Sequence, residues 1–314
     1  MNQKALAVIS FGTTYTLAQD AIMQIESTLS CHVKEYDCFR AFTSKMVIAK
    51  LKREQGQYVL TPEELMEQLY QKGYKEVLCQ PLHIINGFEF EKMYKALSAF
   101  TDKFDKIQIG RPLLTFEDDY KACCDIVMKY APAPKEETAL VFMGHGTSHT
   151  AKVSYSQMQT QMQELGYDNV FIGTVEGEPE ETACEAVIDA AAEAGYTKVI
   201  LRPLMVVAGD HANNDMAGDD DDSWKSQFTA SGNFDSIDTQ IAGLGEIEAV
   251  QKLYVEHTKN AIESLGKVSK SASSSAVSAL EDGTYTAKFN TDSGRRCYKK
   301  YNGEHQITDV EHLR

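Results

Sequence analysis

The stretch Val141-Phe142-Met143-Gly144-His145-Gly146-Thr147-Ser148-His149 has the pattern of a buried strand that ends at a ligand site. Apolar residues run from Ala139 to Met143 and stop at a histidine with a glycine on either side. In open α/β sheets, ligands bind outside the carboxyl ends of the strands. Glycines at 144 and 146 allow a tight turn and the close approach of a flat substrate. His145 is therefore a candidate ligand-facing residue; the alternative is a hydrogen-bonded structural histidine.

Strand and helix patterns alternate on both sides of this stretch. Residues 15–29, for example, place apolar side chains on one side of a helix. Thr61-Pro62-Glu63-Glu64 has the signature of a helix start, with a threonine cap and a glutamate three residues later. The expected strands are residues 4–11, 33–39, 76–82, 106–109, 139–143, 169–175 and 198–205. The alternation predicts an α/β protein whose parallel sheets are covered on both faces.

The two halves of the chain resemble each other. Residues 5–14 align with residues 139–148, and residues 77–89 align with residues 199–211, where both segments contain Pro-Leu and a later glycine. We interpret this as an internal duplication, with chance similarity of buried strands as the alternative. It predicts two similar Rossmann-like lobes, residues 1–131 and 135–266, with a cleft between them.

The duplication has a chemical consequence, because it places Glu89 and His211 at equivalent positions. Each lies two residues after the shared glycine, and His145 ends the first strand of the second half. A carboxylate from one lobe and two imidazoles from the other can therefore converge. Two histidines and a carboxylate suit a divalent transition metal with open coordination positions. Glu176, at another expected strand end, is a candidate second carboxylate; surface or helix-capping roles are the alternative for both glutamates.

Composition excludes several classes of function. The formal charge of −15 argues against nucleic-acid binding, since phosphate backbones need a basic face. Seven scattered cysteines without a CxxC pair fit reduced thiols, and no apolar run is long enough to span a membrane. The N-terminal apolar run is interpreted as a strand rather than a signal peptide, so the expected location is cytoplasmic. The acidic residues 215–222 are expected to form a solvated loop, and motifs for nucleotide binding are absent.

Five motifs, in order, resemble the anaerobic sirohydrochlorin cobalt chelatases of the CbiK type, class II chelatases of cobalamin synthesis. The motifs are Ser-Phe-Gly-Thr-Thr-Tyr (10–15), Phe-Arg-Ala-Phe-Thr-Ser (39–44), Leu-His-Ile-Ile-Asn-Gly-Phe-Glu-Phe-Glu-Lys (82–92), Phe-Met-Gly-His-Gly (142–146) and Pro-Leu-Met-Val-Val-Ala-Gly-Asp-His-Ala-Asn-Asn-Asp-Met (203–216). The resemblance covers about residues 4–265. It implies the chelatase fold, with a tetrapyrrole held between two lobes, and no cofactor beyond the substrate metal, cobalt(II).

By motif position, the resemblance implies that His145 and His211 bind the metal and accept protons. Glu89 and Glu176 would then be their acidic partners, with Glu89 also counted among the catalytic residues. The chemistry agrees, because metallation removes two pyrrole protons while a divalent ion reaches the same nitrogens. A neutral imidazole can hold the ion or accept a proton near neutral pH. The ligands must be few, since a fully enclosed ion could not be handed over.

Sirohydrochlorin carries many carboxylates, which an acidic protein must receive with local donors. We expect those donors at the strand ends of the first lobe. The candidates are Ser10, Thr13, Thr14, Arg40 and, with less support, Lys45. His83 is a candidate for the pocket wall, with a place in the core as the alternative.

The resemblance ends near residue 266. Residues 267–278 are rich in serine and typical of a linker, and residues 282–289 alternate like a strand. We expect residues 267–314 to form a short tail of unknown role. The other readings of the whole chain are an iron or nickel chelatase, or a non-catalytic tetrapyrrole- or heme-binding protein. The resemblance is compatible with a homo-oligomer and with no partner other than sirohydrochlorin and cobalt ion.

Overall fold

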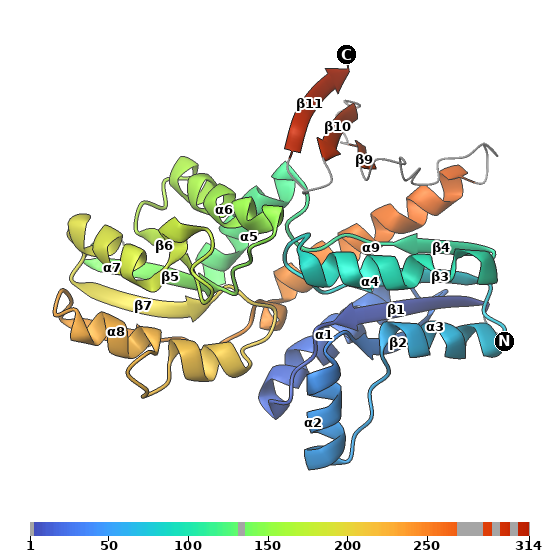
Figure 1. The fold of residues 1–314 in the computed structure, drawn as a ribbon, viewed down its shortest axis with the longest axis horizontal. Helices are drawn as coiled ribbons and strands as arrows, with labels where there is room; N and C mark the ends of the chain where they lie inside the picture. Colours follow the sequence, from blue (N-terminus) through green and yellow to red (C-terminus); the bar gives the residue numbers. More distant parts are fainter. Residues whose placement is uncertain (1–2, 131–135, 269–284, 291–295, 302–306, 314) are drawn as a thin grey trace. The chain divides into compact units, whose positions relative to one another are not determined.

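The computed structural model describes residues 3–130, 136–268, 285–290, 296–301 and 307–313. Its compact units are residues 1–265 and 266–314. Figure 1 shows the order of the elements along the chain. The α-helices that begin in the first unit are α1 (Thr16–His32), α2 (Lys45–Gln55), α3 (Pro62–Gln71), α4 (Phe88–Ser98), α5 (Glu117–Tyr130), α6 (Val153–Glu164), α7 (Cys184–Glu193), α8 (Trp224–Ala230) and α9 (Glu248–Val268).

The first lobe is built on a parallel sheet in the order β2-β1-β3-β4. Its strands are β1 (Lys4–Ser10), β2 (Asp37–Phe42), β3 (Glu76–Pro81) and β4 (Lys106–Ile109). Residues Ala5 to Ile9 of β1 are all apolar because both faces of the sheet are covered. Leu6 and Val8 pack in one hydrophobic cluster, and Ala5, Ala7 and Ile9 pack in another.

The second lobe repeats this topology in a parallel sheet of order β6-β5-β7-β8. Its strands are β5 (Thr138–Gly144), β6 (Val170–Thr174), β7 (Lys198–Pro203) and β8 (Ser236–Thr239). Even the Pro-Leu pairs are equivalent: the amide of Leu82 donates to Ile9 O, and that of Leu204 donates to Met143 O, each at 2.8 Å. The two sheets therefore share one topology, as the internal similarity predicts.

Helices α5 and α9 each pack against a different lobe from the one whose strands precede them in the sequence. Helix α5 follows the first sheet but packs on α6, where Tyr120 OH donates to Ser154 Oγ (2.9 Å). Helix α9 follows the second sheet, yet Thr258 Oγ1 on α9 donates to Gln80 Oε1 on β3 (3.0 Å). Figure 1 shows α5 beside α6 and α9 beside the first sheet. The expected lobe of residues 135–266 thus contains a helix that packs on the other sheet.

The structure corrects three expectations about single elements. The second strand begins at Asp37, not at residue 33, because Val33 caps α1 and its carbonyl accepts from Tyr36 N (3.0 Å). Helix α8 and strand β8 were not predicted, because they are short and follow an acidic segment. Their apolar contribution rests on few side chains, chiefly the buried Trp224 and Phe228.

The second unit contains an antiparallel sheet in the order β11-β10-β9. Its strands are β9 (Tyr285–Asn290), β10 (Arg296–Tyr301) and β11 (Ile307–Leu313). The expected strand at residues 282–289 corresponds to β9, while the expected linker lies outside the described residues except for its first two positions. Within the described part of the chain, no helix is both long and apolar enough to cross a membrane.

Candidate metal and tetrapyrrole site

His145 follows β5 in a turn that only glycine neighbours allow. Gly146 has a φ of +87°, and a Cβ there would lie 2.8 Å from the Cβ of Glu176. A Cβ on Gly144 would lie 2.5 Å from the ring of Tyr155, whose hydroxyl accepts from Gly146 N at 3.1 Å. Burial raises the pKa of Tyr155, so the phenol stays neutral and supports the turn. The exposed imidazole of His145 is thus held on a fixed backbone.

His211 lies beyond β7 and caps a π-helix, Ala212–Met216. Its Nδ1 is 2.7 Å from Oδ2 of Asp215, four residues later. The ring of His211 lies against the ring of His145, with centroids 4.8 Å apart and planes at 87°. The structure therefore brings together the two histidines expected from the sequence, both on the second lobe.

The two expected carboxylates occupy different surroundings. Glu176 is exposed, and its amide donates to His145 O at 2.9 Å. Glu89 lies in the first turn of α4, with Lys92 Nζ 3.8 Å from its Oε1. Its Oε2 is shielded from solvent and has no hydrogen-bond partner among the described residues. Across those same residues, no group of three or more His, Cys, Asp and Glu side chains is placed to hold a metal.

Contacts between the lobes flank the histidine pair. His149 Nε2 lies 3.1 Å from Oε1 of Glu91, and its ring meets Phe88 edge-on with centroids 4.8 Å apart. The first turn of α4, which carries Glu89, therefore lies against the loop that follows His145. His149 is buried, and its Nδ1 accepts from Ala151 N at 3.0 Å, which is a structural role in the loop after His145.

A second contact lies beside His211. Tyr15 of the first lobe donates through its hydroxyl to Asp210 Oδ1 (2.9 Å) and accepts from Asn214 Nδ2 (3.3 Å). Burial and the hydrogen bond to Asp210 raise the pKa of Tyr15. These hydrogen bonds hold the loop after β1 next to the π-helix. The two segments approach closely, since a Cβ on Gly209 would lie 3.2 Å from Thr13 Oγ1.

Five exposed apolar side chains lie where helices leave the carboxyl ends of the strands. Each belongs to the residue after β1 or to the first two residues of a helix that follows a strand. They are Phe11 (47% exposed), Leu17 (84%), Met46 (79%), Phe88 (53%) and Val153 (58%). An apolar surface at the ligand-binding end of the sheets suits a flat organic molecule.

The candidate substrate-binding residues of the first loop are largely buried. Ser10 ends β1, and its Oγ has no partner among the described residues. Thr13 Oγ1 accepts from Tyr15 N (3.2 Å), and the carbonyl of Thr14 accepts from Gln55 Nε2 (2.8 Å). These residues lie at the expected edge of the sheet.

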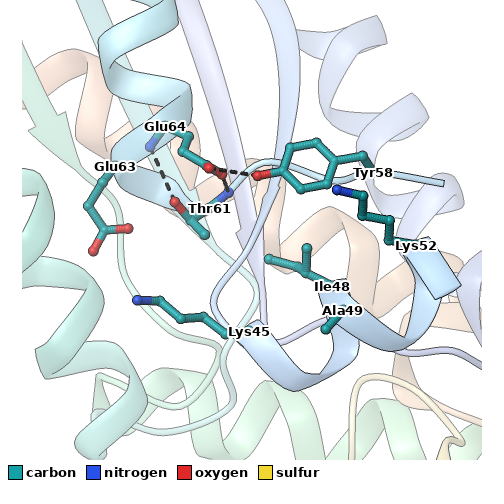
Figure 2. A pocket seen from close by; sticks show the side chains of 8 residues that line it. All are labelled: Lys45, Ile48, Ala49, Lys52, Tyr58, Thr61, Glu63 and Glu64. Atoms are coloured by element: carbon teal, nitrogen blue, oxygen red, sulfur yellow. Dashed lines mark hydrogen bonds between the residues drawn. The ribbon is translucent and has the colours of Figure 1, made fainter.

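Arg40 and Lys45 lie beside shallow hollows of the first lobe. Arg40 stands two residues before the end of β2, rather than at the end as expected, and donates to Glu26 at 2.7 and 2.5 Å. Those bonds raise the pKa of Arg40, which lines a hollow of about 550 Å³. Lys45 lines a neighbouring hollow of about 530 Å³. Figure 2 shows Lys45 in this hollow, together with the hydrogen bond that the Tyr58 hydroxyl donates to Glu64.

His83 lies two residues beyond the end of β3. Both ring nitrogens are shielded from solvent and lack partners among the described residues. Phe90 lies edge-on to the ring, with centroids 6.4 Å apart. Burial lowers the pKa of His83 to about 4, so this imidazole is neutral near pH 7.

Comparison with known proteins identifies the family. The model of the family described as cobalt chelatase (CbiK) matches residues 4–263. The chain belongs to this family. Sirohydrochlorin cobaltochelatase of Salmonella typhimurium is 38% identical to it over 261 residues, which cover 83% of this chain and 97% of that protein. Sirohydrochlorin cobaltochelatase CbiKC of Nitratidesulfovibrio vulgaris is 28% identical over 270 residues, or 84% and 93% of the two chains.

Solved structures support the same fold for this CbiK-family chain. SirB from Bacillus subtilis with Fe³⁺ superposes with a TM-score of 0.56 at 16% identity, covering 84% of this chain and 98% of SirB. The sirohydrochlorin chelatase SirB from B. subtilis subspecies spizizenii, in complex with cobalt, gives 0.54 at 12% identity, covering 84% and 97%. The two-lobed chelatase fold expected from the sequence is confirmed.

Asp215 is the neighbour of the histidine pair that sequence reasoning missed. From the sequence, Asp215 was expected to lie in a solvated acidic loop, residues 215–222. A detectable signal was present, since His211 and Asp215 are four residues apart and face each other on one helical turn. This spacing was not recognised as a contact because no helix was expected in the acidic run.

Proposed function

We propose that this chain inserts cobalt(II) into sirohydrochlorin without ATP. The observation that carries the proposal is the contact between the His145 and His211 rings beyond the carboxyl ends of β5 and β7. Two adjacent imidazoles can share the work of holding an incoming divalent ion and accepting pyrrole protons. The names of the relatives supply the substrate and the metal.

The proposed roles of the other site residues follow from their positions. Glu89 and Glu176 act as acidic partners that offset metal charge and take up protons, supported by the partnerless Oε2 of Glu89. The exposed apolar side chains at the strand ends pack on the macrocycle. Ser10, Thr13 and Thr14 at the end of β1 bind the carboxylates of the substrate. Arg40 and His83 are further substrate-binding residues in this proposal.

The metal ion is a substrate in this scheme, and no further cofactor takes part. A donor set of two imidazoles and scattered carboxylates matches that role, because it leaves coordination positions for the tetrapyrrole nitrogens. Imidazole nitrogen also binds iron(II) and nickel(II), so the ligands alone do not select cobalt.

A metal panel tests the proposal. Anaerobic protein is mixed with sirohydrochlorin or protoporphyrin and with cobalt(II), iron(II), nickel(II) or zinc(II), and the absorption of the metallated product is followed. The expected result is protein-dependent formation of cobalt-sirohydrochlorin above the rate without protein. A change in absorption that also occurs without metal would indicate a tetrapyrrole-binding protein, and faster insertion of iron or nickel would reassign the metal.

A further inference from the structure

The segment after β7 has an unusual backbone that determines where Asp215 lies. The π-helix Ala212–Met216 begins directly after His211, and π-helical turns are rare and frequent at functional sites. Asn213 Nδ2 fixes its start by donating to Ala208 O (3.1 Å) and Gly209 O (2.7 Å). Gly218 closes it, because a Cβ there would lie 2.4 Å from Asn214 O.

This backbone brings the Asp215 carboxylate to one particular nitrogen of His211. The contact is Nδ1 to Oδ2 at 2.7 Å, a distance typical of a charge-assisted hydrogen bond. An ionised carboxylate can only accept, so Nδ1 carries the hydrogen. The lone pair of the neutral ring is therefore on Nε2, which makes no hydrogen bond within the described residues.

His145 is held in the same way by a different group. Its Nδ1 lies 3.0 Å from Gly146 O, and a carbonyl oxygen can only accept. Both imidazoles are thus fixed as Nδ1–H tautomers, with Nε2 as the nitrogen that can bind a metal ion or take a proton. For His145 the backbone fixes the tautomer, whereas for His211 a side chain does so.

We propose that Asp215 is a positioning residue for metal insertion, which orients the His211 ring and holds its Nε2 lone pair available. The proposal rests on the proposed function, because it assigns the residue a part in that reaction. The opposing view is an exposed pair of charges four residues apart, which contributes little beyond local stability. The side chains of His211 and Asp215 are 37% and 43% exposed, so stability alone gives no reason for the contact.

Asp215→Asn tests the proposal, because an amide keeps the shape of the carboxylate but can donate to Nδ1. Donation from the amide would move the ring hydrogen to Nε2 and block that nitrogen. Asp221→Asn is the matched control, since Asp221 is exposed in the same acidic run. Protein labelled with ¹⁵N-histidine reports the tautomer by NMR at pH 8, with His211→Gln used to assign the signal. Insertion kinetics and cobalt(II) affinity are measured on the same samples.

The expected result is an Nδ1–H signal for His211 in the wild type and in Asp221→Asn. In Asp215→Asn the signal should move to the Nε2–H form, and kcat for cobalt insertion should fall by about 10- to 100-fold. The KM for sirohydrochlorin and the thermal midpoint should stay close to wild type. An Nε2–H ring in the wild type, or wild-type kcat in Asp215→Asn, would overturn the proposal.

Failure of the proposed function has a different signature. A wild-type protein that inserts no metal would contradict the chelatase assignment. The tautomer of His211 and its cobalt(II) affinity would still decide whether Asp215 positions the ring for a metal.

Discussion

His145 is the residue on which the proposed chemistry depends most directly. Replacing it by alanine removes a metal ligand or proton acceptor from an exposed turn whose backbone is fixed by glycines and Tyr155. We expect His145→Ala to lower the rate of cobalt insertion by about 10²- to 10⁴-fold, the range typical of a lost acid–base group. Stopped-flow or steady-state absorption with sirohydrochlorin measures the loss.

His32→Ala is the matched control, because His32 is exposed at the end of α1 and contacts only Thr28 O in the hydrogen-bond pattern. It should keep the wild-type rate. The thermal midpoints of both variants should lie near that of the wild type. Undiminished turnover of His145→Ala would remove His145 from the reaction.

His83 should make the protein less stable in mild acid. Its pKa is lowered to about 4 by burial, while an unfolded histidine has a pKa of about 6.5. The unfolded state therefore binds more protons between these values, and stability falls as the pH drops from about 6.5 to 4. From pH 8 to pH 5, His83 accounts for a loss of about 2 kcal/mol.

Urea unfolding of wild type and His83→Leu at pH 8 and pH 5 measures this contribution. The variant should lose about 2 kcal/mol less between the two pH values, because leucine takes up no proton. His32→Leu, at an exposed position, should retain the wild-type pH dependence. Equal losses of stability in wild type and His83→Leu would show that folding does not lower the pKa of His83.

Functional residues that lie at the ends of strands could be predicted from the sequence. Residues whose role depends on the side chain that they contact could not. His145 and His211 were found because apolar runs stop next to them and the two halves align. Asp215 was not, since its role depends on a π-helix that no local pattern predicts. The position of Arg40 was misjudged because its strand ends at Phe42, three residues later than expected.

At the scale of elements, helix α9 is tied to the first sheet by a buried polar contact. Thr258 and Gln80 are fully buried, and Gln80 Oε1 accepts from Thr258 Oγ1 at 3.0 Å. Thr258→Val removes that donor and leaves the buried amide oxygen without it. Such a loss costs about 1–3 kcal/mol.

Urea unfolding should therefore show Thr258→Val to be less stable than the wild type by that amount. Thr229→Val is the control, since Thr229 is an exposed helical residue. Its hydroxyl donates to the carbonyl four residues back, as the hydroxyl of Thr258 does to Tyr254 O at 2.7 Å. The control substitution should change the free energy of unfolding by less than about 0.5 kcal/mol. Equal stability of Thr258→Val and Thr229→Val would mean that the contact between α9 and β3 is dispensable.

Elements with strong local patterns were predictable, and elements defined by their surroundings were not. The helix from Pro62 has the expected threonine cap and capping box, with Glu64 N donating to Thr61 Oγ1 at 3.3 Å. Strand β8 has only the residues Ser-Ile-Asp-Thr, and it exists because β7 offers a free edge. The partner of α9 is also set by long-range packing, which periodicity does not reveal.

At the scale of the whole molecule, the second unit should be dispensable for metal insertion. The family model matches residues 4–263, and the compact first unit ends at Leu265. A chain truncated after Val268 keeps α9 complete and should have the kcat and KM of the full chain within about twofold. Parallel kinetics on both chains measure this, and a loss larger than tenfold would show that the second unit takes part in the reaction.

Helices α5 and α9 each pack against the other lobe, so the two halves of the first unit depend on each other. A protease that cuts the chain between residues 130 and 136 would break the covalent link between the lobes but not their contact, because each fragment would still contain a helix that packs on an element of the other, α5 on α6 and α9 on β3. Either half produced alone would lose one of the helices that pack in the hydrophobic core shared by the two sheets. The two halves share one sheet topology, but they fold together rather than as two separable copies.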